Sequence, residues 1–193
     1  YTNDILYEFI KDHFGREVTS AYLKLNPLAY KADLGRYCLL YQRGGWYFDI
    51  AIECINPYII KKETDFLCFR DEQRHSKTSW AVCNGIFWSK GKNKIIERCI
   101  QKVLQNCNSN WYGRTPLCPT GPSLFGESIV MENRSQNILF GDLIRPNIPF
   151  TRKNIPVLKN IFKSKFYLPN GKTFALVKPS RGGDLKSLGV KGG

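Results

Sequence analysis

Apolar residues recur every three or four positions in several stretches of the chain, a spacing that predicts amphipathic helices. The clearest helix is expected over residues 92–107, where lysines and a glutamate lie opposite the apolar stripe. Residues 3–25 predict two shorter helices that are broken near Gly15, because glycine disfavours a continuous helix. Two more are expected over residues 27–43 and 120–132. Five helices are therefore predicted, and the segments between them must supply the rest of the fold.

Alternating residues predict a strand over residues 46–53, directly after the glycine pair Gly44-Gly45 that ends the preceding helix. In that helix Asn26 is expected at the N-cap and Pro27 at the first helical position. Short strands are also expected over residues 65–69 and 81–88. Helices and strands that alternate in this way agree with an α/β fold.

Glycine and asparagine mark two further features of the strands. Asn84-Gly85 lies inside a predicted strand, which indicates a β-bulge or a close approach of backbone to a ligand, and equally a simple strand irregularity. Asn170-Gly171 separates two short apolar runs and predicts a β-hairpin.

Three charged residues occupy positions where apolar ones are expected. Asp33 and Arg36 lie three apart and share a helix face with Tyr37 and Leu40. An ion pair on a mostly apolar face is costly unless other groups satisfy it, so it is either an internal salt bridge or part of a ligand site. Asp49 stands in a strand rich in aromatic and β-branched residues, where an aspartate needs a partner.

Residues 30–53 carry a resemblance to a known family. Lys31-Ala32-Asp33, Arg36-Tyr37, Leu40-Tyr41, Gly44-Gly45 and Tyr47-x-Asp49 resemble the donor-binding core of glycosyltransferases whose sugar-binding region contains a DXD motif. These are the family 32 enzymes of capsule, lipopolysaccharide and mannan synthesis, related to the clostridial glucosylating toxins. Weaker similarity continues at Cys83-Asn84-Gly85-Ile86 and at Thr120-Gly121-Pro122.

The resemblance implies a GT-A type fold with a mixed, mostly parallel sheet flanked by helices. In the family two N-terminal strands precede such helices; the sequence contains neither, so either the gene product is longer or the fold lacks them. One catalytic domain is expected over residues 1–177, since 193 residues with 42% hydrophobic content can bury one core. Residues 178–193 are expected to form a basic, glycine-rich tail, or a lid over the diphosphate.

The implied function is transfer of a hexose from a UDP- or GDP-sugar to a glycan or lipid-linked acceptor, with retention of configuration, in surface polysaccharide synthesis. Asp33 and Arg36 would bind hydroxyls of the donor sugar, and Tyr47 would pack beside the nucleotide. Asp49 would be catalytic and bind the metal or the ribose. The other substrate-binding residues expected are Gly45, Asn84, Thr120 and Gly121.

The motif departs from the family at its second carboxylate. The expected Asp-x-Asp reads Asp49-Ile50-Ala51, which leaves Asp49 as the ligand for Mn²⁺ or Mg²⁺ and predicts weakened metal dependence. Glu53 lies about 13 Å further along an extended strand, too far to replace the missing ligand unless the strand turns.

The net charge of +13 requires an acidic partner. The positive charge is concentrated after residue 150, so the protein is expected to contact an anionic membrane as well as to bind the nucleotide. Nucleic acid is the last alternative, because no recognition helix or RNA-binding signature occurs. A relative that binds its ligand without turnover is the nearer alternative. Seven cysteines without a C-x-x-C pair indicate reduced thiols and a cytoplasmic protein. The lipid-linked acceptors that the resemblance implies would place it peripherally at the membrane.

Overall fold

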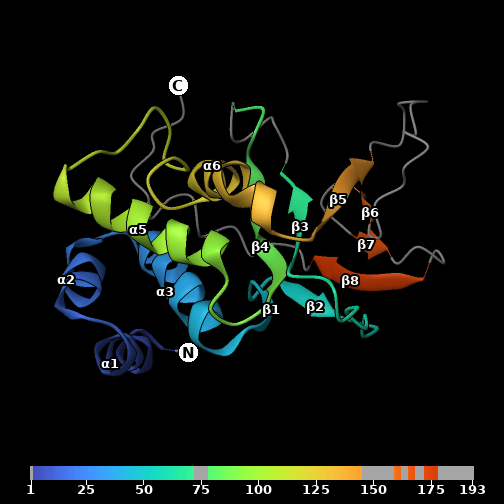
Figure 1. Cartoon of the computed structure of the whole chain (residues 1–193), viewed down its shortest axis with the longest axis horizontal. Helices are drawn as coiled ribbons and strands as arrows, with labels where there is room; N and C mark the ends of the chain where they lie inside the picture. The colour runs from blue at the N-terminus through green and yellow to red at the C-terminus, as the bar shows by residue number, and fades with distance from the viewer. Residues whose placement is uncertain (1, 72–77, 145–158, 162–164, 168–171, 178–193) are drawn as a thin grey trace.

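The computed structural model describes residues 2–71, 78–144, 159–161, 165–167 and 172–177. Its helices occupy one side of the molecule and a curled eight-stranded sheet the other (Figure 1). The α/β class, with a mixed sheet flanked by helices, is confirmed. The helices are α1 (Asn3–His13), α2 (Arg16–Lys24), α3 (Leu28–Arg43), α5 (Lys94–Asn108), α6 (Pro122–Glu132) and the 3₁₀ turn η1 (Asn133–Ser135). The strands are β1 (Gly45–Phe48), β2 (Ile52–Cys54), β3 (Phe66–Arg70), β4 (Val82–Ser89), β5 (Ile138–Ile144), β6 (Lys159–Ile161), β7 (Lys165–Tyr167) and β8 (Thr173–Val177).

All five predicted helices form, with small shifts at their ends. Helix α3 begins one residue later than expected, because Pro27 has an extended ψ of 130° and stands at the N-cap in place of Asn26. It ends at Gly44, whose φ of 63° favours glycine. A Cβ at Gly44 would also lie 2.6 Å from the backbone nitrogen of Gly91. This glycine therefore fixes both the end of α3 and the entry into β1.

Strand β3 separates two hydrophobic cores. Phe66 and Cys68 are buried in a large core with the helices, whereas Leu67 and Phe69 are buried in a smaller core with β7 and β8. Successive side chains of a strand point to opposite faces, so both faces of β3 are covered. This explains why its sequence is a continuous apolar run instead of an alternating one.

The sheet has the strand order β1-β4-β3-β5-β6-β7-β8-β2. Among the described strands, β3–β5 and β5–β6 pair in parallel and the other five pairs are antiparallel. The expectation of a mostly parallel sheet is therefore wrong. Parallel strands require a long crossover between them, and β4, α5 and α6 form the one between β3 and β5.

The strand expected over residues 46–53 is also corrected, because it divides into β1 and β2. The chain turns after Asp49, whose carbonyl oxygen accepts a hydrogen bond from the Ile52 N–H at 2.7 Å. The strands β1 and β2 lie at opposite ends of the strand order but are consecutive in sequence, so the sheet curls on itself. The Phe174 ring of β8 lies 5.0 Å from the Trp46 ring of β1, which closes this curl.

Strand β4 bulges where Asn84-Gly85 predicted it. Leu67 pairs with Trp88 and Phe69 with Cys83, so the single residue Cys68 of β3 faces four residues of β4. The additional residues bend β4 away from β3 and carry Asn84 toward α3.

Other predictions divide between described and undescribed residues. The expected hairpin is confirmed by antiparallel pairing of β7 with β8, although its Asn170-Gly171 turn lies outside the described residues. The basic segment 178–193 also lies outside them. Within the described part of the chain, no helix is long and apolar enough to cross a membrane.

Candidate functional site

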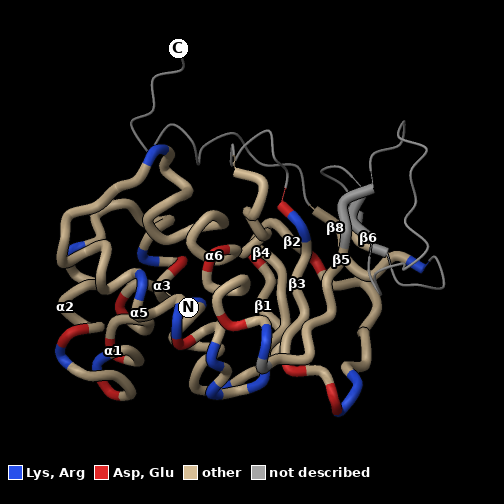
Figure 2. Tube along the Cα trace, turned by 45° about the horizontal axis from the view of Figure 1, so that its top comes forward, with Lys and Arg blue, Asp and Glu red and all other residues tan. Residues whose placement is uncertain are grey.

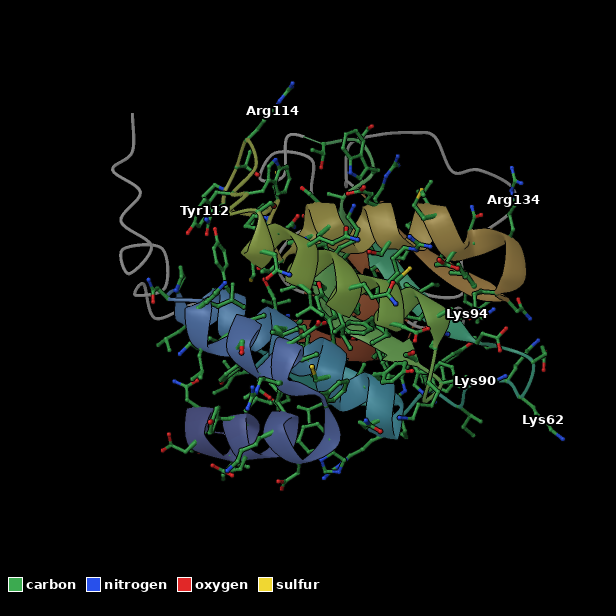
Figure 3. All side chains as sticks on the ribbon, turned by 60° about the vertical axis from the view of Figure 1, so that its left-hand side comes forward. Lys62, Lys90, Lys94, Tyr112, Arg114 and Arg134 are labelled. Carbon is green, nitrogen blue, oxygen red and sulfur yellow. The ribbon has the colours of Figure 1, made fainter. Side chains whose placement is uncertain are left out.

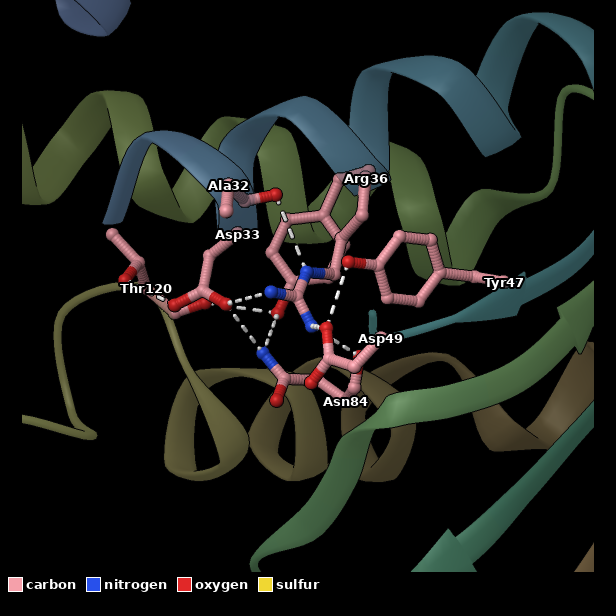
Figure 4. A network of polar contacts seen from close by, with 8 residues as sticks. Ala32, Asp33, Arg36, Tyr47, Asp49, Asn84 and Thr120 are labelled. Atoms are coloured by element: carbon pink, nitrogen blue, oxygen red, sulfur yellow. Dashed lines mark hydrogen bonds and ion pairs between the residues drawn. The ribbon is translucent and has the colours of Figure 1, made fainter. Parts of the chain in front are cut away.

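Asp33 of α3 is the buried end of a polar network (Figure 4). Its residue is 8% exposed, and three side chains satisfy its carboxylate. Thr120 donates its hydroxyl to Oδ2 at 2.7 Å, and Asn84 donates its amide to Oδ1 at 2.8 Å. Arg36 completes the set, with Nη2 at 3.1 Å from Oδ1. The carboxylate therefore joins α3 to the β4 bulge and to the loop before α6.

Arg36 bridges two carboxylates. Its Nη1 donates to the Asn84 carbonyl at 2.7 Å and lies 3.1 Å from Asp49 Oδ1, while Nε donates to the Ala32 carbonyl at 3.2 Å. The guanidinium also lies over the Tyr47 ring, 4.6 Å from its centroid. The Arg36 side chain is only 7% exposed, and its many partners fix it in position.

Asp49 is the solvent-accessible end of the network. Its side chain is 41% exposed, and the Tyr47 hydroxyl donates to Oδ1 at 2.8 Å. Its backbone N–H donates to the Gly85 carbonyl at 2.7 Å. Oδ2 lies directly over Gly85, where a Cβ would be only 2.6 Å away. A glycine is needed at this point of the bulge for the carboxylate to lie where it does.

Burial and the neighbouring charges shift the pKa of three members of the network. Burial raises the pKa of the Asp33 carboxyl, although Arg36, Thr120 and Asn84 act against it. Burial acts to lower the pKa of Arg36, but Asp33 and Asp49 outweigh it and raise that pKa, so the guanidinium stays charged. Burial also raises the pKa of Tyr47, which keeps its hydroxyl a hydrogen-bond donor at neutral pH.

Most residues proposed from the sequence come together here. Asp33, Arg36, Tyr47, Asp49, Asn84 and Thr120 form one connected network, and Gly121 adjoins it, since a Cβ there would lie 3.5 Å from Asp33 Oδ2. Gly45 does not join them. It starts β1 opposite Ser89, at the far end of the strand from Asp49, and a Cβ there would meet only open space.

Tyr37 is a member of the network that sequence reasoning assigned to the apolar face. Its hydroxyl donates to the Thr120 carbonyl at 2.9 Å and accepts from the Asn84 amide at 3.3 Å. Its ring meanwhile packs on Phe125, 5.7 Å away. Its place in the Arg36-Tyr37 pair of the motif and its hydroxyl, which needs a partner when buried, were the signals in the sequence.

The side chains around Asp49 do not fit a divalent cation well. No group of three or more His, Cys, Asp or Glu side chains suited to a metal occurs among the described residues. Asp49 Oδ1 is already taken by Tyr47 and Arg36, and the Arg36 charge would oppose a cation at that oxygen. Ala51 supplies no ligand, and β2 carries Glu53 into the pairing with β8. No chemical step is therefore assigned to a metal.

The chain is similar in sequence to glycosyltransferases. Residues 2–67, which include Asp33, Arg36 and Asp49, match the family "Glycosyltransferase sugar-binding region containing DXD motif". The chain is 25% identical over 166 residues to the uncharacterized glycosyltransferase L373 of Acanthamoeba polyphaga mimivirus. That alignment covers 81% of this chain and 62% of the relative. Among solved structures, the PaToxG glycosyltransferase is 20% identical with a TM-score of 0.49, over 60% of this chain and 40% of that one.

Proposed function

We propose that this chain binds a nucleotide sugar and transfers its hexose, with retention, to a glycan or lipid-linked acceptor. The observation that carries the proposal is the network from buried Asp33 through Arg36 to half-exposed Asp49. A structural ion pair does not need a second carboxylate open to solvent. A sugar site does, because carboxylates and guanidinium groups in fixed positions bind hydroxyl groups with well-defined geometry.

Each network residue has a distinct role in this proposal. Asp49 Oδ2 is the exposed acceptor for a donor hydroxyl, and Arg36 holds the carboxylate in place. Asn84 Oδ1 accepts no hydrogen bond from the described residues, which leaves it free for a second hydroxyl. Asp33, Thr120 and Tyr37 fix Asn84 and Arg36 from behind. Tyr47 lies over the guanidinium and faces the nucleotide side.

The alternative is a relative that binds a nucleotide sugar without turnover. Ala51 favours it, because the second carboxylate of the motif normally holds the ion that neutralises the diphosphate. Both functions predict donor binding. Release of free nucleotide in the presence of acceptor distinguishes them, because only the enzyme produces it. Surface polysaccharide as the product, and a cytoplasmic site of action at an anionic membrane, belong to the same proposal.

Isothermal titration with UDP-glucose, UDP-galactose, UDP-N-acetylglucosamine and GDP-mannose, with and without Mn²⁺, tests donor binding directly. We expect Asp33→Asn to weaken binding of the preferred donor by about 1.5–3 kcal/mol, because the charged hydrogen bonds of Asp33 hold Arg36 and Asn84 in position for the donor. Its free energy of unfolding should change by less than about 1 kcal/mol, because Arg36 keeps Asp49 as a partner.

Glu8→Gln is the matched control, since Glu8 forms an exposed ion pair with Lys11 on α1. It should alter neither donor binding nor stability. A large loss of stability in Asp33→Asn with unchanged donor affinity would mean that the network is only structural.

A further inference from the structure

A cavity of about 460 Å³ lies at the end of the network opposite Asp49. It opens between the end of α2, the start of α3, and the end of α5 with the loop that follows. Its volume is within the range of small-molecule sites. The lining residues used below are Asn26, Tyr30, Asn106, Asn110, Trp111 and Tyr112.

The cavity adjoins the proposed donor site through two residues. Thr120 lines it and also donates its hydroxyl to Asp33. Tyr30 lies one helical turn before Asp33 on α3, so both side chains occupy the same helix face. In Figure 4 Thr120 lies on the far side of Asp33 from Asp49. A molecule in the cavity would therefore approach the network from the side that the proposed donor does not occupy.

The side chains of the cavity suit a neutral, hydroxyl-rich ligand. Three aromatic rings contribute apolar faces and three asparagines contribute amides that both donate and accept. Lys24 is the single charged side chain among the described lining residues, and no carboxylate lines the cavity there. A phosphate would require more cationic groups than this. A pyranose ring offers an apolar C–H face for an aromatic ring and hydroxyls for amides.

Trp111, one of the three aromatic residues, is held in place before any ligand arrives. Trp111 is 49% exposed and Tyr112 is 68% exposed, and Figure 3 shows Tyr112 at the surface near the end of α5. The Trp111 N–H donates to the Asn106 carbonyl at 2.9 Å. Gly113, with φ of 70°, lets the Trp111 ring approach so closely that a Cβ would lie 2.9 Å from it. A fixed, exposed aromatic surface reduces the entropy lost when a ligand binds.

We propose that this cavity binds a sugar unit of the acceptor glycan, with Trp111 and Tyr112 as its platform. The proposal rests on the glycosyltransferase function, because it assigns the cavity to the second substrate of that reaction. It commits to an acceptor saccharide and not to the nucleoside of the donor.

The test uses NMR of the full chain labelled uniformly with ¹⁵N, so that the Trp111 indole reports binding in the wild type and backbone amides report it in both variants. The probes are the methyl glycosides of glucose, galactose, mannose and N-acetylglucosamine, each added up to about 50 mM, which detects binding as weak as a millimolar Kd. Trp111→Ala is compared with Trp80→Ala, a matched control because Trp80 is 51% exposed and does not line the cavity. Donor affinity is measured on the same samples by titration.

We expect at least one glycoside to shift the Trp111 indole resonance. Trp111→Ala should raise the Kd of that glycoside at least about tenfold, a change of about 1.4 kcal/mol. Trp80→Ala should leave it within about twofold, and both variants should retain wild-type donor affinity.

Three results would overturn the inference. In the first, no glycoside perturbs the Trp111 resonance while the donor binds normally, and in the second, Trp80→Ala weakens glycoside binding as much as Trp111→Ala does. In the third, UMP shifts the Trp111 resonance and displaces the glycoside. The third result would make the cavity the nucleoside site. Glycoside binding at Trp111 in a chain that binds no nucleotide sugar would instead contradict the proposed function and leave the cavity a saccharide site.

Discussion

Arg36 contacts one carboxylate that is buried and one that is half exposed, and this asymmetry distinguishes the site from an ordinary internal ion pair. Removing a partner from a buried pair costs several kcal/mol when the remaining charge is left alone. Here either carboxylate can be removed without leaving the guanidinium unpaired, because the other carboxylate still contacts it. Ligand contacts at Asp49 can therefore vary without loss of the fold.

Gly85→Ala tests how the β4 bulge positions Asp49. The new Cβ would overlap Oδ2 at 2.6 Å, so the flexible carboxylate must rotate away from its present place. We expect donor affinity to fall about tenfold, or about 1.4 kcal/mol. Stability should change by less than about 1 kcal/mol, since the overlap is with a side chain that can move. Calorimetric donor titration and urea unfolding measure the two effects.

Ala51→Asp should restore a second carboxylate to the turn after Asp49. Hard oxygen ligands set the affinity for Mn²⁺ and Mg²⁺, and a further carboxylate adds both a bond and a charge. We expect the Kd for Mn²⁺ to decrease at least about tenfold, or about 1.4 kcal/mol, as measured by titration. Tight Mn²⁺ binding by the unmodified chain that this substitution leaves unchanged would contradict the expectation.

At the residue scale the sequence identified site residues where a charged residue occupied a position that the pattern assigns to an apolar one. Asp33, Arg36 and Asp49 were identifiable because charged residues stood on apolar faces, and all three lie in one network. Tyr37 was missed because an aromatic ring satisfies an apolar pattern whatever its hydroxyl contacts. Gly45 was included with the site because it adjoins the motif in sequence, but the extended β1 separates it from Asp49.

At the scale of elements, α6 depends on a glycine for its distance from β4. A Cβ at Gly126 would lie 1.8 Å from the Trp80 carbonyl oxygen, which is backbone and cannot rotate aside. We expect Gly126→Ala to destabilise the protein by about 1–3 kcal/mol, the usual cost of overpacking. Urea denaturation followed by circular dichroism measures it.

Gly15→Ala is the control for this substitution. Its φ is −69° and no atom lies within 4 Å of the added Cβ, so neither strain nor overlap arises. Stability should change by less than about 1 kcal/mol, because the freedom lost by the unfolded chain offsets the poorer N-cap that alanine gives α2. Equal effects at both glycines would show that close packing of α6 is not the cause.

Helices were better predicted than strands for a physical reason. An amphipathic stripe such as that of α5 depends only on which side of the helix faces the core. Strand direction depends on partners far away in sequence, and the β3–β4 pair is antiparallel without any local sign of it. The turn after Asp49 was hidden because Ile50, although apolar, is 99% exposed. The alternating pattern therefore continued through a point where the chain reverses.

At the scale of the whole molecule, charge divides the chain unevenly. Basic and acidic residues are interspersed over the described helices and turns (Figure 2). From residue 152 onward the sequence has ten basic residues, with Asp184 as the one acidic residue. These basic residues are Arg152, Lys153, Lys159, Lys163, Lys165, Lys172, Lys178, Arg181, Lys186 and Lys191. This composition predicts attraction to anionic surfaces.

We expect the chain to bind vesicles that contain phosphatidylserine at low salt and to dissociate as salt rises toward about 0.5 M, where the Debye length is below about 5 Å. Vesicle sedimentation measures this, and neutral phosphatidylcholine vesicles are the control. Binding that resists salt would exclude an electrostatic origin. Tight binding to duplex DNA with a sequence preference would favour the nucleic-acid alternative.

The bond from Thr120 to Asp33 spans 87 positions of the chain, and this span has a consequence during synthesis. A ribosome adds roughly 5–20 residues per second, so Thr120 follows Asp33 by on the order of ten seconds. Until then the carboxylate of Asp33 lacks its hydroxyl partner, and burial of this face of α3 is opposed by its desolvation cost. The nascent helix should therefore stay hydrated until α5 and the following loop have emerged. Binding of the donor by a newly made chain would then show that the chain has folded as far as Thr120.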